Sequence, residues 1–291
     1  MNDSARFRID RRAVARAANR ASAGYDEAVQ LPARVNAELL ERLQFFRLEP
    51  RVIVDLGCGT GAGAAALRRR YPRARVVAVD LAFGMTQRAR RGQRFWRRFE
   101  CLCADACALP LAAQSIDLVF SSLMLQSCDD PAALFTQVQR VLRPGGLVLF
   151  GSLGPDTLHE LRSAWAAADA HSHVSAFADM SQLGAAISHA GLAEPVIDRE
   201  MQLDHYPQVS SLMEQLRAVG ASHVAADRRR SLTGRGRLRS MIDAYEMLRT
   251  PAGLPASWEI IYGAAFAGSK RTAGETTVPL SAVRSRPRSA S

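Results

Sequence analysis

The stretch that decides the fold is Val52-Ile53-Val54-Asp55-Leu56-Gly57-Cys58-Gly59-Thr60-Gly61. Its three consecutive apolar residues are typical of a strand that is buried on both faces. The glycines that follow let the backbone turn sharply, and they let a ligand approach the main chain because no Cβ stands in the way. We therefore expect a buried strand over 51–56 and a ligand-binding turn directly after it.

Strand-like and helix-like patterns alternate around this stretch, which favours βαβ units and a parallel sheet. Up to residue 151 we expect helices over 33–47, 61–71, 83–94 and 131–142, and strands over 51–56, 75–80, 99–104, 116–121 and 147–151. Beyond it we expect helices at 155–170 and 179–190, a strand at 195–202, a helical insert at about 207–250 and a final strand at 258–266.

Length and composition indicate a globular protein. The chain has 291 residues, of which 48% are apolar, and this suffices for one large domain. No apolar run reaches the roughly 20 residues that span a bilayer, and no signal-peptide segment is visible, so we expect a cytoplasmic protein with no membrane partner. Residues 1–24 carry six arginines among alanines, as transit peptides do, but Asp3 and Asp10 favour a surface helix.

The five cysteines do not suggest a disulfide framework or a metal site. Their number is odd, which favours a reducing compartment. Cys101, Cys103 and Cys107 lack zinc-knuckle spacing and have no histidine nearby, so we expect no metal.

The formal net charge is +10, and Lys270 is the only lysine. Six arginines fall within 88–98 and another six within 228–239. Each run is either a solvated face or a docking surface for an acidic partner. No nucleic acid is expected as a partner, because no basic patch is interleaved with aromatic residues.

The glycine pattern alone leaves the ligand open. Gly57, Gly59 and Ala62 satisfy the dinucleotide pattern G-x-G-x-x-G/A, which would fit a dehydrogenase. Asp55, however, would repel a pyrophosphate and attract a cation. The order Asp-x-Gly-x-Gly-x-Gly resembles the first motif of class I S-adenosylmethionine-dependent methyltransferases, whose cofactor carries a sulfonium and an ammonium group but no phosphate.

Two further acids end the next two predicted strands. Asp80 lies nineteen residues past Gly61, where an acid can accept hydrogen bonds from both ribose hydroxyls, although a lone Asp is often a helix N-cap. Asp105 can accept from the exocyclic amine of adenine, with Leu109 beside the ring. Together with the glycine turn, these acids extend the methyltransferase resemblance over 51–151.

The resemblance implies an α/β, Rossmann-like class I methyltransferase fold. Its sheet would be seven-stranded and mostly parallel with helices on both faces, an N-terminal lid helix and a helical insert before the last strand. The chain would divide into a lid segment at 1–32, a methyltransferase domain at 33–267 and a disordered tail at 268–291, whose low apolar content fits disorder. Residues 51–151 would form the cofactor half and 152–267 the acceptor half. The implied S-adenosylmethionine site is Asp55, Gly57, Cys58, Gly59, Gly61, Asp80, Leu81, Asp105, Ala106, Ser121 and Ser122.

Several segments narrow the resemblance. The stretch 121–128 is similar to the Ser-Asn-Leu-Ala-Leu-Gln-Trp-Cys signature of the biotin-pathway malonyl-acyl-carrier-protein O-methyltransferases, with Ser122 and Ser127 in place of Asn and Trp. The stretch 153–165 is similar to that family's Gly-Pro-x-Thr-Leu-x-Glu-Leu-Arg segment. Further similar segments are 20–26, 173–177, 243–246 and 254–259.

This narrower resemblance implies methyl transfer to the free carboxylate of malonyl-acyl-carrier protein, or of malonyl-coenzyme A. A carboxylate is ionised at neutral pH, so no general base is needed and catalysis would rest on placement. The candidate orienting groups are Arg162, Tyr25 and His173. Tyr25 would act as a phenol donor and as a lid residue over the cofactor, whereas Arg162 and His173 could instead be ordinary surface residues. Acyl-carrier proteins are acidic, so the arginine runs would attract them electrostatically.

Three alternatives remain open at this point. Respiratory complex I assembly factors share the fold, and one type is thought to hydroxylate a partner's arginine; the arginine-rich N-terminus favours them, whereas Leu125-Gln126 favours the biotin branch. An RNA methyltransferase would fit the charge. A scaffold without catalysis would fit a degenerate cofactor motif, but Asp55 and Asp80 are both present.

Overall fold

The computed structural model describes residues 9–93, 98–169, 171, 173–220 and 234–268. These residues form one seven-stranded sheet with the order β3-β2-β1-β4-β5-β7-β6. Strand β7 is antiparallel to both of its neighbours, and the other pairings are parallel. The predicted α/β fold with a mostly parallel seven-stranded sheet is confirmed. The strands are β1 (Val52–Leu56), β2 (Arg75–Asp80), β3 (Glu100–Cys103), β4 (Ile116–Ser122), β5 (Leu142–Leu153), β6 (Leu192–Tyr206) and β7 (Leu254–Ala267).

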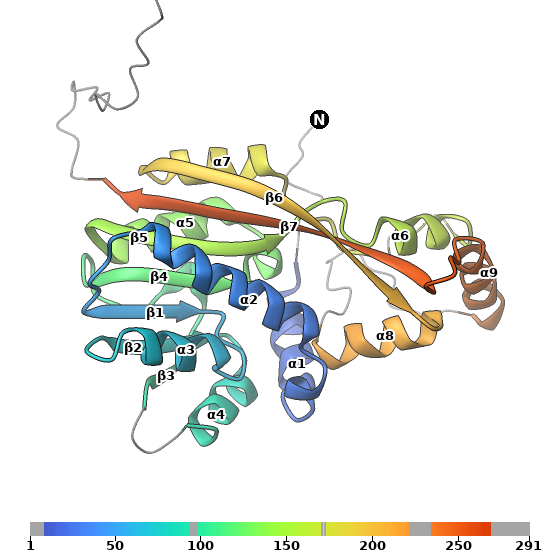
Figure 1. Cartoon of the computed structure of the whole chain (residues 1–291), viewed down its shortest axis with the longest axis horizontal. Coiled ribbons are helices and arrows are strands. Elements are labelled where there is room, and N and C mark those ends of the chain that lie inside the picture. The colour runs from blue at the N-terminus through green and yellow to red at the C-terminus, as the bar shows by residue number, and fades with distance from the viewer. Residues whose placement is uncertain (1–8, 94–97, 170, 172, 221–233, 269–291) are drawn as a thin grey trace, which may run out of the picture.

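Helices cover both faces of the sheet (Figure 1). They are α1 (Arg11–Ala21), α2 (Gln30–Arg42), α3 (Ala62–Arg70), α4 (Phe83–Arg91), α5 (Pro131–Val141), α6 (His159–Ala166), α7 (Met180–His189), α8 (Val209–Ala218) and α9 (Arg235–Glu246). Short 3-10 turns lie at Tyr25–Glu27, Leu43–Phe45, Ala106–Ala108 and Leu125–Ser127.

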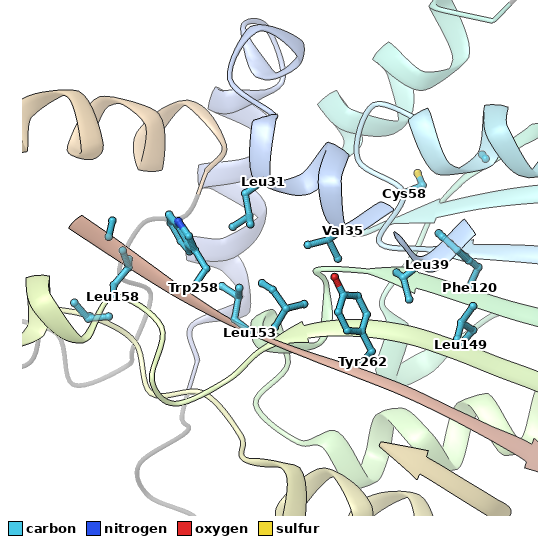
Figure 2. Close-up of a cluster of buried hydrophobic side chains, with 14 of the residues drawn as sticks. Leu31, Val35, Leu39, Cys58, Phe120, Leu149, Leu153, Leu158, Trp258 and Tyr262 are labelled. Carbon is cyan, nitrogen blue, oxygen red and sulfur yellow. The ribbon is translucent and has the colours of Figure 1, made fainter. Parts of the chain in front are cut away.

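The apolar core has two layers because successive strand residues point to opposite faces of the sheet. Ile53 belongs to the layer under α2 and α3, whereas its neighbour Val54 belongs to the layer under α5 and α7. Figure 2 shows the first layer, where Leu39 of α2 lies close to Phe120 and Leu149. Burial on both faces explains why the central strands appear in the sequence as unbroken apolar runs.

The N-terminal helix α1 packs on α4 at the edge of the sheet. Asp10 caps it by accepting from the Ala13 N–H (3.0 Å), and Asn19 Oδ1 accepts from the Gly84 N–H at the start of α4 (2.6 Å). The buried residues of α1 are alanines spaced four apart, so the helix lies close to its neighbours. The prediction of a helix before the sheet is confirmed; the division at residue 32 stays a prediction.

Several predicted boundaries were wrong beyond residue 141. Strand β5 begins at Leu142, because Leu142 pairs with Ile116 before a register shift. Helix α6 begins only at His159, since the Leu158 N–H donates to the Ser257 carbonyl (2.7 Å) and holds the preceding segment against β7. Strands β6 and β7 are longer than predicted because they pair with each other almost throughout.

Parts of two predictions lie outside the described residues. The helical insert is confirmed by α8 and α9, but 221–233 are not described, and neither are 269–291, so the disordered tail stays a prediction. None of the described helices is long and apolar enough to cross a membrane. Within the described ranges, no three potential metal ligands of the His, Cys, Asp or Glu type come together.

Candidate functional site

A cavity opens at the carboxyl ends of β1, β2 and β4, and we call it the first cavity. Ligands of open α/β sheets bind at this edge. Eight of the sequence-predicted residues line the first cavity: Tyr25, Gly57, Gly59, Asp80, Leu81, Asp105, Ala106 and Ser122. They come from five separate segments, which only the fold brings together.

The glycine turn forms one wall of the first cavity. Gly57 has φ +76° and Gly59 has φ +53°, in the left-handed region that favours glycine. A Cβ on Gly57 would collide with Met124, which lines the same cavity. A Cβ on Gly59 would lie 3.7 Å from the ring of Tyr25, so that ring lies over the turn.

Asp80 ties the glycine turn to the start of α4. Its carboxylate accepts from the Gly59 N–H (2.9 Å) and from the Ala82 N–H (2.8 Å). Burial raises the pKa of Asp80, and these two hydrogen bonds oppose the rise. The carboxylate also lines the cavity, where its remaining lone pairs can accept from ligand hydroxyls.

Asp105 has a partner that the sequence did not reveal. Its Oδ1 accepts from the Cys107 N–H (2.8 Å) and its Oδ2 accepts from Arg11 Nη1 (2.9 Å). Arg11 also donates twice to Asp129 Oδ1, at 3.0 and 2.7 Å. The arginine begins α1, and nothing distinguishes it in the sequence from the other arginines nearby.

Asp55 does not line the first cavity, which corrects the expectation that it faces a cation there. The side chain is buried, and a Cβ on Gly63 would lie 2.8 Å from its Oδ2, so the carboxylate lies beneath the first turn of α3. Burial raises the pKa of Asp55 to about 7, against the opposing effect of the Ala64 N–H. The residue therefore supports the glycine turn from below.

Three more predicted residues lie outside the lining of the first cavity. A Cβ on Gly61 would lie 2.8 Å from the Phe99 ring, so this glycine permits close packing. Cys58 is buried, which raises the pKa of its thiol. Ser121 is also buried, and its hydroxyl donates to the Leu56 carbonyl (2.8 Å). These residues shape the turn and the strand end instead of contacting the cavity.

Ser122 is the predicted residue with unused bonding capacity. Ser122 lines the first cavity, and its buried hydroxyl has no hydrogen-bond partner among the described residues. A buried hydroxyl without a partner is costly, so a ligand oxygen or nitrogen at this position would recover that cost. Glycines that admit a ligand, the Asp80 carboxylate and this hydroxyl therefore form a set that fits a nucleoside-containing ligand.

A second cavity adjoins the first. The two share the lining residues Val14, Tyr25, Leu123, Ser127, Val219 and Gly220. The other walls of the second cavity come from the start of α2, the segment after β5, residues 173–177, α8 and Trp258 of β7. No described arginine or lysine lines it. A ligand in the second cavity would thus meet apolar and neutral polar groups together with one histidine.

Tyr25 lines both cavities, and its role as a lid over the cofactor stays a prediction. Its neighbour Asp26 accepts from the Thr60 hydroxyl (2.7 Å) and pairs with Arg88 of α4 (3.3 Å). These contacts hold the turn that carries Tyr25 on the glycine loop. Burial raises the pKa of Tyr25 to about 12, so the phenol is a neutral hydrogen-bond donor at physiological pH.

His173 lines the second cavity and is held on two sides. Its Nε2 lies 2.9 Å from Asp169 Oδ1, and its ring stacks on Trp165 with the centroids 3.8 Å apart. The placement agrees with the sequence-based candidate, although contact with a substrate stays a prediction.

Arg162 lies elsewhere, which corrects its assignment as the orienting cation of the site. It lines neither cavity, and its guanidinium donates to the backbone carbonyls of Pro155 (2.8 Å) and Thr157 (3.3 Å). The helical spacing correctly placed Arg162 after the fifth strand. Helical spacing could not show that the chain between β5 and α6 folds back, so that its carbonyls accept the hydrogen bonds of the guanidinium.

Two buried carboxylates shape the wall of the second cavity, and sequence reasoning gave them no role. Glu259 Oε2 accepts from the Asp156 N–H (2.7 Å), and Glu160 accepts from the Ser257 hydroxyl and N–H. These bonds join the segment after β5 to β7 and so position Leu158 in the cavity wall. The only sequence signal for a role of these two acids was that both fall in segments that resemble the family.

Comparisons with known proteins agree with this geometry. A family model described as a methyltransferase domain matches residues 54–150. The malonyl-[acyl-carrier protein] O-methyltransferase of Gallionella capsiferriformans is 40% identical over 271 residues, which cover 91% of this chain and 93% of the relative. The enzyme of the same name from Xylella fastidiosa is 44% identical over 257 residues, covering 87% of each chain.

Solved structures resemble the fold at low sequence identity. A putative methyltransferase from Bacillus halodurans has a TM-score of 0.55 at 17% identity and covers 80% of this chain and 100% of its own. The phosphoethanolamine N-methyltransferase 2 of Haemonchus contortus, in complex with S-adenosyl-L-methionine, has a TM-score of 0.52 at 17% identity and covers 86% and 57%. At this identity the likeness shows the fold alone.

Proposed function

The chain belongs to the family of malonyl-[acyl-carrier protein] O-methyltransferases, and from this premise we propose how it acts. It transfers the methyl group of S-adenosylmethionine to the free carboxylate of malonyl-acyl-carrier protein, and the methyl ester serves as a precursor in biotin synthesis. One observation carries the site assignment: the first cavity shares six lining residues with a second cavity that no described arginine or lysine lines. The donor occupies the first cavity and the malonyl group the second.

The residues of the first cavity fit S-adenosylmethionine. Gly57 and Gly59 leave room for the ligand against the main chain, Asp80 accepts from the ribose hydroxyls, and the unpartnered Ser122 hydroxyl supplies a further polar contact. When bound, S-adenosylmethionine supplies an activated methyl group on a sulfonium. Tyr25 covers the junction at which that methyl group meets the acceptor.

Placement is the main contribution of the protein to the reaction. The malonyl carboxylate is ionised at neutral pH, so no residue has to remove a proton from it. The cavity walls hold one carboxylate oxygen in line with the sulfur–methyl bond and exclude water. Two opposite charges disperse as the methyl moves, so a tightly paired arginine would stabilise the ground state more than the transition state. A lining without arginine or lysine avoids that penalty.

The carrier protein docks on the side of the molecule that carries α8 and α9. Helix α8 lines the second cavity, and α9 packs against α6 and α8 (Figure 1). Arg235 and Arg239 of α9 are exposed and form no ion pair with a described residue, so they are available to an acidic partner. Helix α4, which carries Arg88, Arg90 and Arg91, packs on α1 instead, and its Met85 lines the first cavity. The reaction takes place in the cytoplasm, with malonyl-coenzyme A as an alternative acceptor.

Incubation with labelled S-adenosylmethionine and malonyl-acyl-carrier protein tests the proposal. Mass spectrometry is expected to find one added methyl group, as an ester on the malonyl carboxylate. A parallel reaction with malonyl-coenzyme A measures the preference between the two acceptors. Cofactor binding without a methyl ester on either acceptor would overturn the proposed reaction and favour a non-catalytic scaffold.

A further inference from the structure

Trp258 lies in the wall of the second cavity and carries a buried indole N–H without a described partner. The side chain is only 4% exposed, so bulk water does not hydrate the N–H. Leaving a buried donor unsatisfied costs about 1–3 kcal/mol. A ligand oxygen at this position would remove that cost.

The surroundings of Trp258 limit what this ligand atom can be. Figure 2 shows the indole extending from β7 beside Leu31, Leu153 and Leu158, and all four residues line the second cavity. Because this wall is apolar, it suits an uncharged acceptor such as a carbonyl oxygen better than a carboxylate. Indole is a donor only and stays neutral, so it recognises an oxygen without supplying a charge.

The position of Trp258 relative to the first cavity selects one end of the malonyl group. Tyr25 and Leu123 line both cavities and mark the junction, whereas Trp258 lines only the second. The reacting carboxylate must lie at the junction, next to the methyl donor. The thioester carbonyl is separated from that carboxylate by the methylene carbon and therefore lies farther into the second cavity. It is the oxygen that Trp258 can meet.

We propose that the Trp258 Nε1–H donates a hydrogen bond to the thioester carbonyl oxygen of the malonyl acceptor. This inference rests on the proposed function and adds to it the residue that fixes the register of the acceptor. The thioester carbonyl keeps its charge and bonding while the carboxylate is methylated. The hydrogen bond therefore stabilises the bound acceptor and the transition state alike, and its loss raises KM and leaves kcat nearly unchanged.

Trp258→Phe tests the hydrogen bond, and Tyr262→Phe is the matched control. Tyr262 lies four residues farther along β7 and also has a buried hydroxyl without a described partner, but it lines neither cavity. We expect KM for a malonyl thioester of N-acetylcysteamine to rise about two- to twelvefold in Trp258→Phe, as for a net hydrogen bond of about 0.5–1.5 kcal/mol. Tyr262→Phe should leave KM unchanged.

A second variant separates the hydrogen bond from the smaller volume of phenylalanine. Replacing Trp258 by 3-benzothienylalanine exchanges the N–H for sulfur and keeps the two rings, so the same rise in KM is expected. A KM equal to that of the wild type in this variant would overturn the inference.

A binding measurement keeps the inference separate from turnover. Titration calorimetry with the same malonyl thioester, in the presence of S-adenosylhomocysteine, should show the same loss of affinity in both Trp258 variants. Affinity for S-adenosylhomocysteine itself should be unchanged. If the wild type forms no methyl ester, the proposed function fails; if the wild type is active and both variants bind the thioester normally, only the role of Trp258 fails.

Discussion

Arg11 Nη1 lies 2.9 Å from Asp105 Oδ2, and this ion pair joins helix α1 to the segment after β3. Both residues line the first cavity, so the contact lies in its wall. Asp129 receives a second contact from the same guanidinium, at 2.7 Å. The Arg11 side chain is 40% exposed and the two aspartates are about one third exposed, so each pair contributes modestly, about 0.2–1 kcal/mol. The N-terminal helix is thus held over the cavity by contacts that are weak enough to open.

Removal of the two Arg11 ion pairs should weaken cofactor binding. In Arg11→Ala, loss of the two ion pairs is expected to raise the Kd for S-adenosylmethionine about three- to tenfold, mainly through faster dissociation. Stopped-flow displacement measures that rate. Arg12→Ala is the control, because Arg12 lies on the same helix, is exposed, and forms no ion pair with a described residue. Equal dissociation rates for the two variants would show that the Arg11 ion pairs do not slow dissociation of the cofactor.

Asp55 should make the folded protein less stable as the pH rises towards neutrality. Burial raises its pKa from 3.8 to about 7, so between these values the folded state binds a proton that the unfolded state has lost. The free energy of unfolding therefore falls with rising pH across this window. Asp55→Asn does not titrate and should lose this part of the fall. Urea unfolding from pH 5 to 8 measures it, and identical slopes for the two proteins would refute the assignment.

Arg162 should matter for stability and not for acceptor binding. Its guanidinium holds the Pro155 and Thr157 carbonyls, and hydrogen bonds to charged groups contribute about 1.5–3 kcal/mol each when intact. We expect Arg162→Ala to lower the free energy of unfolding by about 2 kcal/mol, with KM for the malonyl thioester within about twofold of the wild type. Thermal unfolding and steady-state kinetics measure the two effects. A large rise in KM without loss of stability would restore Arg162 as the anchor of the carboxylate.

The α9 arginines should contribute to binding of the carrier protein, whereas the α4 arginines should not. Reversal of charge at Arg235 and Arg239 is expected to lower kcat/KM for malonyl-acyl-carrier protein about fivefold or more at 50 mM salt, and the difference should shrink by about 300 mM. The control is reversal at Arg90 and Arg91, which are exposed on α4 and change the net charge equally. The small malonyl thioester should be used equally well by both variants. An equal loss in both would indicate only a general effect of net charge.

The local pattern of the sequence was enough to predict the α/β architecture and much of the first cavity. Gly57, Gly59, Asp80 and Ser122 lie at strand ends, and strand ends are set by apolar periodicity and by glycine. In a parallel sheet these ends meet at one edge, so their convergence follows from the fold class. Periodicity said nothing about Tyr25, which was a candidate lid residue only because segment 20–26 resembles the family.

The tertiary structure alone decided which way several side chains point and what they meet. Asp55 and Gly57 are two residues apart, yet the acid lies beneath α3 while the glycine faces the cavity. Arg162 donates to the Pro155 carbonyl in the loop that precedes its helix. Arg11 differs from the neighbouring arginines because it pairs with Asp105, which lies on a segment distant in sequence. Trp258 of β7 lines the second cavity together with Leu31 of α2 and Leu153 of β5. Such contacts depend on chain segments far apart in sequence, and local propensity carries no information about them.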